Sequence, residues 1–415
     1  MSAAPQVPTA SPLHPDGAGP AASGGVSSGV GEILALLRDG AALTRSEVMT
    51  RTGLSRTTVN QRLDQLLQAR LIVPAGEDSP TRGRPATRFG FNAARGVLLV
   101  ADLGATGMRA AVCDLNGVIA SESEQRIDIT EGPERIIGVV GEHFTRLLAE
   151  AGHTPQEVHG IGMSVPGPVD FARGAVVNPP IMTGWDGYDI RGWFASHYDC
   201  PVLVDKDVNA MAFGEYRRNY PTTSHMLMLK LGTGIGAGVV VGGQIYRGAD
   251  GAAGDIGHSQ LSRPDDDDQP LCRCGNTGCV EAYVGGWALM RDLQAAGRDV
   301  SSVDAAIELA LAGDPVAVQI TRRAGRILGA SIAGAVSLFN PRVVVIGGQL
   351  ARVEGQLFAG IREMVYRRSL PLATTRLQIV RSSLDNSAGP IGLALSVADA
   401  IFAPDAVERL ILDAA

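Results

Sequence analysis

Three of the five cysteines in the chain fall in one short segment, spaced C-x-C-x4-C at Cys272, Cys274 and Cys279. A histidine, His258, lies one loop upstream. Three thiolates and one imidazole form a complete tetrahedral set of zinc ligands, and a set of four protein ligands is typical of structural zinc. Glycines adjoin two of the cysteines, where a chain folding back on an ion often needs positive φ. The spacing predicts a structural zinc site; free buried thiols are the alternative.

The same stretch resembles the signature of a known family. The motif C-x-C-G-x-x-G-C-x-E at 272–281, with a G-H pair upstream, is similar to that of the ROK family of repressors, open reading frames and kinases. The resemblance covers roughly Val30 to the C-terminus. It implies an α/β fold in which an N-terminal winged helix-turn-helix precedes a two-lobed, actin-like (ribonuclease H-like) ROK sugar kinase domain. It also implies that His258 and the three cysteines bind zinc while the flanking Asp255 and Glu281 hold a sugar.

Composition limits the cellular setting. The chain has 415 residues, of which 45% are hydrophobic and 19% are charged, so it can bury a large core. Five cysteines, three of them in the metal motif, do not make a disulfide framework, which fits a reducing cytoplasm. The N-terminus lacks the pattern of a signal peptide. The apolar run 226–243 is glycine-rich and interrupted by Lys230, so it indicates buried strands and no membrane partner.

Charge is distributed unevenly along the chain. Residues 29–95 contain ten arginines, no lysine and six acidic residues, a balance of +4. Because the whole chain carries −7, the remainder carries −11. A small basic domain on a larger acidic one indicates that only the small domain meets a polyanion.

The first 95 residues divide into a tail and a small domain. Residues 1–28 are mostly Ala, Pro, Gly and Ser, which predicts a disordered tail. A helical period begins at Val30, and Thr44 with Glu47 predicts a capping box at the start of a second helix. Ser55 caps a third helix expected over 56–69. Two helices joined by a tight, Gly-containing turn indicate a helix-turn-helix within a DNA-binding domain at 29–92.

The third expected helix carries polar side chains near its N-terminal end. Such side chains can donate and accept hydrogen bonds at base edges in a major groove. The candidate DNA-contacting residues here are Ser55, Arg56, Thr57, Thr58, Asn60 and Gln61. The alternative is a helical dimerisation module with a polar, solvated face.

A wing is expected after this helix. Strands at 71–73 and 89–91 flank a loop that contains Arg82-Gly83-Arg84-Pro85. An extended segment with two arginines suits a narrow minor groove, where the negative potential is enhanced. The segment also resembles the core of an AT-hook. A solvated basic loop is the alternative for the wing taken alone.

Two glycine-containing loops resemble the phosphate loops of the family's kinases, within an actin-like domain expected over 96–415. The candidate nucleotide-loop residues are Asp102, Gly104 and Thr106 in the first loop and Gly232, Thr233 and Gly234 in the second. The first loop has Ala105 where the kinases usually have glycine. An added methyl group can block the close backbone approach that a nucleotide phosphate needs.

The expected effector pocket combines loops and charged residues. Segments 164–170, with Gly167, and 178–186, with Asn178, resemble the sugar-pocket loops of the family. The kinases have Asn-Asp where this chain has Lys206-Asp207, and their aspartate is the general base. Lys206 could ion-pair with Asp207 and lower its basicity, bind an anionic ligand such as a sugar phosphate, or point to solvent. The candidate effector-binding residues are Gly167, Asn178, Lys206, Asp207, Asp255, His258 and Glu281.

Two functions compete. The first is a regulator, most simply a repressor, that binds an operator in double-stranded DNA and responds to a sugar or sugar phosphate of carbohydrate metabolism. The second is a glucokinase-like sugar kinase that needs ATP and Mg²⁺ and uses Asp207 as its base. Three departures from the kinase pattern favour the non-enzymatic regulator: Ala105, Lys206 and Asp255. At the last of these the family has a glutamate, which is one methylene longer. A homodimer or dimer of dimers on a roughly palindromic site is expected.

Overall fold

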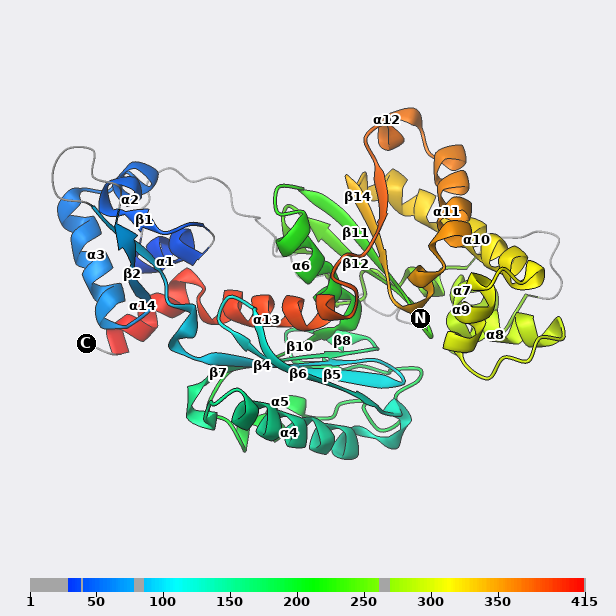
Figure 1. Cartoon of the computed structure of the whole chain (residues 1–415), viewed down its shortest axis with the longest axis horizontal. Coiled ribbons are helices and arrows are strands. Elements are labelled where there is room, and N and C mark those ends of the chain that lie inside the picture. The colour runs from blue at the N-terminus through cyan, green and yellow to red at the C-terminus, as the bar shows by residue number, and fades with distance from the viewer. Residues whose placement is uncertain (1–28, 39, 78–85, 261–268, 414–415) are drawn as a thin grey trace, which may run out of the picture.

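The computed structural model describes residues 29–38, 40–77, 86–260 and 269–413. The tail expected at 1–28 and the wing arginines Arg82 and Arg84 lie outside the described residues. A winged helix-turn-helix domain precedes two α/β lobes, and the last two helices return to the N-terminal domain (Figure 1). The predicted fold class is confirmed.

The N-terminal domain is organised by its helix caps. The Thr44 backbone N–H donates to Glu47 Oε2 (2.7 Å), and the Glu47 N–H donates to Thr44 Oγ1 (3.2 Å), so the predicted capping box is present. Gly53, at φ 70°, ends that helix, and Ser55 caps the next by accepting from the Thr58 N–H. The elements are α1 Val30–Arg38, β1 Leu43–Thr44, α2 Arg45–Thr52, α3 Arg56–Gln68, β2 Ile72–Glu77 and β3 Thr87–Phe91.

The first lobe is a five-stranded sheet in the order β10-β7-β4-β5-β6. Strand β4 is almost entirely buried, as its continuous apolar sequence predicts for a central strand. Helices α4 and α5 cover one face of this sheet and α13 covers the other (Figure 1). The elements are β4 Val97–Leu103, β5 Gly107–Asp114, β6 Ile119–Arg126, α4 Pro133–Glu150, β7 Val158–Val165, β8 Val169–Asp170, β9 Ala175–Val176, α5 Ile190–Ala195 and β10 Val202–Lys206.

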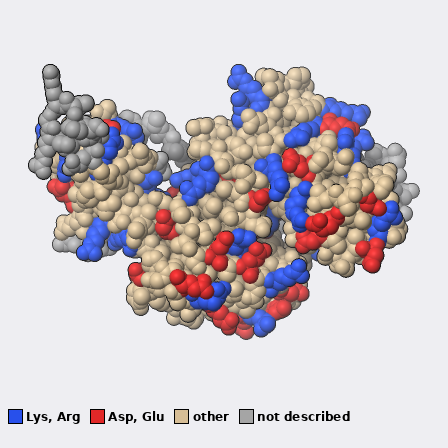
Figure 2. All heavy atoms as spheres, viewed as in Figure 1, with Lys and Arg blue, Asp and Glu red and all other residues tan. Residues whose placement is uncertain are grey.

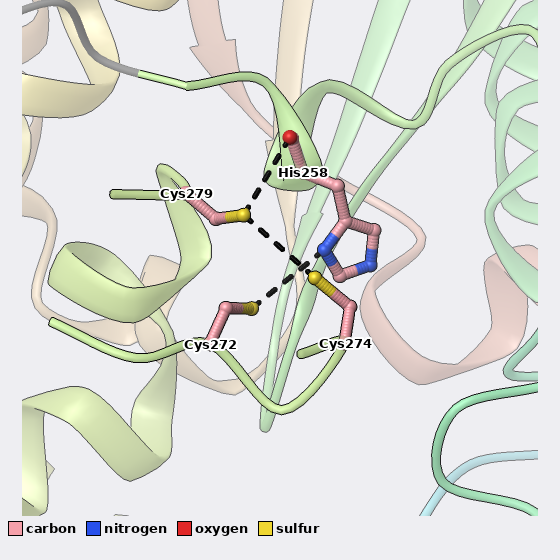
Figure 3. A group of neighbouring side chains, drawn as sticks. All are labelled: His258, Cys272, Cys274 and Cys279. Carbon is pink, nitrogen blue, oxygen red and sulfur yellow. Dashed lines mark hydrogen bonds between the residues drawn. The ribbon is translucent and has the colours of Figure 1, made fainter. Parts of the chain in front are cut away.

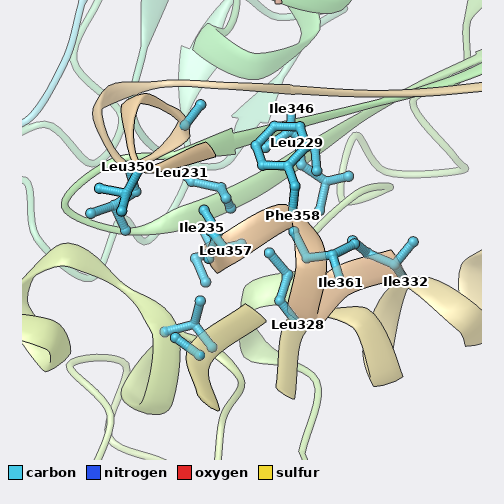
Figure 4. Packing of buried hydrophobic residues seen from close by; sticks show 14 of the residues in the cluster. Leu229, Leu231, Ile235, Leu328, Ile332, Ile346, Leu350, Leu357, Phe358 and Ile361 are labelled. Carbon is cyan, nitrogen blue, oxygen red and sulfur yellow. The ribbon is translucent and has the colours of Figure 1, made fainter. Parts of the chain in front are cut away.

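The second lobe has a sheet in the order β13-β12-β11-β14-β15. Apolar residues of β11, β12 and β14 pack against α10 and α11, where Phe358 and Leu328 are fully buried (Figure 4). Helix α6 packs on β11 and β12. The elements are α6 Asp207–Asn219, β11 His225–Leu231, β12 Ile235–Val241, β13 Gln244–Ile245, α7 Glu281–Val284, α8 Gly286–Ala295, α9 Val303–Leu311, α10 Pro315–Phe339, β14 Val343–Gly347, α11 Glu354–Arg368, α12 Pro371–Thr374 and β15 Gln378–Arg381.

Two helices close the chain, α13 Ala388–Ile401 and α14 Pro404–Asp413. Pro404 starts α14, because proline fits the first helical turn, where its missing N–H has no intrahelical partner. No single helix among the described residues is long and apolar enough to cross a membrane. Helices α13 and α14 together pass that test of length and composition, but they are bent by 54° to each other. Most of α13 is buried between the first-lobe sheet and α6, which identifies it as a core helix.

Helices α6 and α13 approach each other through glycines. A methyl group built on Gly214 would lie 2.2 Å from the carbonyl oxygen of Ala388. One built on Gly392 would lie 1.8 Å from the carbonyl oxygen of Ala210. Both contacts are with backbone atoms, which cannot move aside without shifting a helix. The two helices therefore form one tightly packed unit between the lobes.

We expect Gly214→Ala to destabilise the protein by about 1–3 kcal/mol, the usual cost of overpacking a core. Gly138→Ala is the matched control, because Gly138 also lies in a helix and has no atom within 4 Å of an added methyl group. That change should be neutral or stabilising by up to about 1 kcal/mol through helix propensity. Thermal and urea unfolding measure both; equal stability of the two variants would contradict the packing described here.

Candidate functional site

The predicted metal ligands converge in the structure. One ligand atom from each of His258, Cys272, Cys274 and Cys279 lies within 4.8 Å of all the others (Figure 3). The Sγ atoms of Cys274 and Cys279 are 3.7 Å apart, and Cys272 Sγ is 3.8 Å from His258 Nδ1. A tetrahedral ion with Zn–S bonds of about 2.3 Å separates two sulfurs by roughly 3.8 Å. The spacing of the donors therefore suits such an ion.

Local backbone geometry and burial also fit a cation. The glycines beside the cysteines, Gly275 and Gly278, have φ of 92° and 73°, as the turn around an ion was expected to require. Burial raises the pKa of the Cys279 thiol to about 12 and also raises the pKa of Cys272. A divalent cation would supply the charge that keeps such thiols deprotonated. Among the described residues, these four form a cluster suited to a metal ion.

Glu281 connects this cluster to the second glycine loop. Its side chain is buried, and Cys272 Sγ lies 3.9 Å from Glu281 Oε1. Glu281 Oε2 accepts a hydrogen bond of 3.0 Å from the N–H of Ile235, directly after the loop of Gly232, Thr233 and Gly234. A methyl group on Gly234 would lie 2.5 Å from that same oxygen. The His258–cysteine cluster thus adjoins a carboxylate that in turn holds the loop.

Lys206 bridges the two lobes. It ends β10 of the first lobe, and its Nζ donates to Asp255 Oδ1 (2.5 Å) and to the carbonyl of Ala253 (3.3 Å) in the second. The side chain is 7% exposed, so it does not point to solvent. The ion pair with Asp207 considered from the sequence is not formed: Lys206 ends β10, Asp207 begins the following helix α6, and Asp207 pairs with Lys230. Asp255 is the partner instead.

Asp207 is paired with the other lysine of the chain. Lys230, at the end of β11, places its Nζ 2.6 Å from Asp207 Oδ2. Burial alone would lower the pKa of Lys230, but the carboxylates of Asp207 and Asp102 outweigh it and raise that pKa. The lysine therefore stays charged and compensates the negative charge of Asp207, the residue that a kinase would use as its base.

The first glycine loop lies beside these charges. Asp102 accepts a hydrogen bond from the hydroxyl of Ser164, and burial raises the pKa of its carboxyl group, with Asp207 adding to the rise and Lys230 opposing it. The N–H of Gly104 donates to the carbonyl of Gly107 (2.8 Å), which closes the turn that contains Thr106. Ala105 packs against the first-lobe core.

The expected pocket loops meet a third ion pair. Arg247 Nη2 lies 2.6 Å from Asp205 Oδ2, and its guanidinium stacks on the ring of Phe171. Gly167 and Asn178 lie in adjoining loops of the first lobe; Asn178 is exposed with φ 42°, and its N–H donates to Asp186. No sequence motif marked Lys230, Arg247 and Asp205, whose ion pairs lie beside the expected site residues. Only Lys230 gave a signal, as one of two lysines in the chain.

The candidate DNA-contacting side chains gather at the start of α3. Ser55, Arg56, Thr57 and Gln61 are exposed, whereas Thr58 and Asn60 are half-buried. The opposite face of α3 is buried through Val59, Leu63 and Leu66. Lys and Arg side chains lie among Asp and Glu on the visible faces of all parts of the molecule (Figure 2).

Comparison with known proteins decides the family. The sequence model of the ROK family matches residues 98–400. The chain belongs to the ROK family. A winged helix-turn-helix DNA-binding model matches residues 31–73.

Three relatives illustrate the likeness. The xylose repressor of Caldicellulosiruptor bescii is 26% identical over 389 residues, which cover 90% of this chain and 96% of the repressor. A ROK family transcriptional regulator, a homolog of the E. coli MLC protein, superposes with a TM-score of 0.78 at 25% identity, over 92% of this chain and 98% of its own. A ROK glucokinase from Streptomyces griseus, solved with glucose and AMPPNP, has a TM-score of 0.62 at 29% identity and covers 72% of this chain and 98% of its own.

We expect one zinc ion per chain, and we expect Cys272→Ser to lose it because three remaining ligands hold zinc poorly. Cys200→Ser is the matched control, since Cys200 lies outside the cluster. Elemental analysis by mass spectrometry measures the metal in the purified proteins. Zinc-free wild-type protein, or full zinc in the Cys272 variant, would contradict the assignment.

Proposed function

We propose that this protein is a sugar-responsive, DNA-binding transcriptional repressor that carries out no catalysis. The observation that carries the proposal is the Lys230–Asp207 ion pair in a ROK domain joined to a winged helix-turn-helix. The pair occupies the carboxylate that phosphoryl transfer would need as a base. The names of relatives that span nearly the whole chain, including a xylose repressor, support the same conclusion.

The DNA interface consists of α3 and the wing. Arg56 and Asn60 read base edges in the major groove, with Ser55, Thr57, Thr58 and Gln61 placed around them, and Arg82 and Arg84 enter the flanking minor groove. A homodimer places two such domains on a roughly palindromic operator. With duplex DNA as its partner and bacterial relatives, the protein acts in the cytoplasm.

The effector is a sugar or sugar phosphate bound between the lobes. The binding residues are Gly167, Asn178, Lys206, Asp207, Asp255, His258 and Glu281. His258 contributes from the metal cluster, which holds structural zinc and supports Glu281 without offering an open coordination position. The three cations of the cleft, Lys206, Lys230 and Arg247, are each bound to a carboxylate.

Arg56→Ala should weaken binding to a duplex selected by the wild-type protein by about 1–3 kcal/mol and relax base preference at one position. Arg84→Ala should weaken binding and reduce the preference for A·T pairs at the flank. Arg135→Ala, an exposed arginine of α4 in the first lobe, is the control. Footprinting and fluorescence anisotropy measure the changes, and light scattering of the complex should give two chains per site. Unchanged affinity and footprint in both DNA-domain variants would refute the interface.

The kinase alternative makes the opposite prediction for ATP. With ATP and Mg²⁺ we expect no sugar-dependent release of ADP over a panel of pentoses, hexoses and amino sugars, because Asp207 is neutralised by Lys230. A coupled ADP assay measures turnover, with Asp207→Asn as the control for contaminating kinases. Turnover that disappears in the Asp207 variant would establish the kinase instead.

A further inference from the structure

One arginine ties the DNA-binding domain to the C-terminal helices. Arg38, the last residue of α1, is 9% exposed and donates from Nη2 to Asp399 Oδ1 of α13 at 2.9 Å. Its guanidinium lies 5.6 Å from the ring of Phe91 in β3 and 5.2 Å from the ring of Phe402 after α13. These two rings pack edge to face. The contacts tie a helix and a strand of the N-terminal domain to α13.

The docking is more than this one ion pair. Buried side chains of α1 and α3 share a hydrophobic cluster with α13, α14 and the inner face of β4 and β5. A methyl group on Gly31 of α1 would lie 2.4 Å from backbone atoms of Pro404, where α14 begins. Displacement of α13 therefore acts on the DNA-binding domain through packed atoms as well as through charge.

Asp399 is shared with a second arginine. Its other oxygen, Oδ2, accepts from Nη1 of Arg217 at 2.6 Å. Arg217 lies in the last turn of α6, and Asp399 thus joins α6 and α1 through one carboxylate. Neighbouring Arg218 makes different contacts, donating to the carbonyls of Asn116 and Gly117 in the first lobe.

The other end of α6 lies at the proposed effector site. Lys206 is its N-cap residue and Asp207 is its first residue. Each of them is ion-paired with a residue of the second lobe, Asp255 or Lys230. Thirteen residues at 1.5 Å per residue make a helix of about 20 Å. One helix therefore spans the distance from the cleft to Asp399.

We propose that α6 transmits effector binding to the DNA-binding domain through the Arg217–Asp399–Arg38 ion network. The inference rests on the proposed function and specifies how its site is regulated. A ligand that alters either cleft ion pair acts on the first turn of α6. The glycine contacts with α13 keep α6 from bending freely, so its last turn moves with its first. Asp399 passes that movement to Arg38, with a coupling no larger than the ligand's differential affinity for the two states.

Arg217→Met separates this role from docking. The change removes the link to α6 and leaves the Arg38–Asp399 pair in place, so the DNA-binding domain stays docked. Arg218→Met on the same helix is the matched control. We expect both variants to bind the selected duplex within threefold of wild type. D-xylose and D-glucose serve as probes. If either sugar changes the duplex affinity of the wild-type protein tenfold or more, that change should persist in the Arg218 variant and fall below twofold in the Arg217 variant.

A sugar-independent arm separates failure of this network from failure of sugar sensing. Lys230→Met disturbs the start of α6, so it should change the duplex affinity of the wild-type protein by threefold or more. Added to Arg217→Met, the same substitution should change the duplex affinity by less than 1.5-fold. Loss of the Lys230→Met effect in the Arg217→Met background supports the network even if neither sugar is the effector. An Arg217 variant in which Lys230→Met has its full effect, or a single Lys230 variant with wild-type affinity, would overturn it.

Discussion

The close packing of α6 on α13 determines how the rest of this molecule is connected. Helix α6 rests on the second-lobe sheet, and α13 rests on the first-lobe sheet. Gly214 and Gly392 allow their backbones to touch, so the helices that join the two lobes are in direct contact. Because α13 also carries the DNA-binding domain, all three parts of the chain meet at this pair. A large side chain at either glycine would separate the parts that a regulator has to couple.

Ion pairs gather at the start of α6, where the two lobes meet. A phosphoryl-transfer site needs an aspartate free to accept a proton, and here Lys230 holds Asp207 at 2.6 Å. Lys206 and Asp255, two of the positions that depart from the kinase pattern, bind each other. The two departures are therefore coupled. Where the kinases have asparagine and glutamate, this chain has a lysine on one lobe that pairs with the shorter aspartate on the other. The Lys206–Asp255 pair joins the two lobes, whereas the Asp207–Lys230 pair joins the first turn of α6 to β11 within the second lobe.

Features encoded by neighbouring residues could be predicted from the sequence. The Thr44–Glu47 capping box, the buried strand β4 and the converging cysteines all follow from local spacing, and the structure contains them. The partner of Lys206 could not be predicted, because Asp255 lies 49 residues away on the other lobe. Sequence adjacency suggested Asp207, but Asp207 starts α6 and pairs with Lys230.

In the proposed function, sugar binding between the lobes controls DNA binding without chemistry on the sugar. The most direct measurement is a fluorescence anisotropy titration of the selected duplex with wild-type protein, repeated with each sugar of a panel and without nucleotide. We expect at least one sugar to change the dissociation constant tenfold or more and to be recovered unmodified afterwards. Duplex affinity that no sugar changes, or a change that appears only with ATP and Mg²⁺, would contradict it.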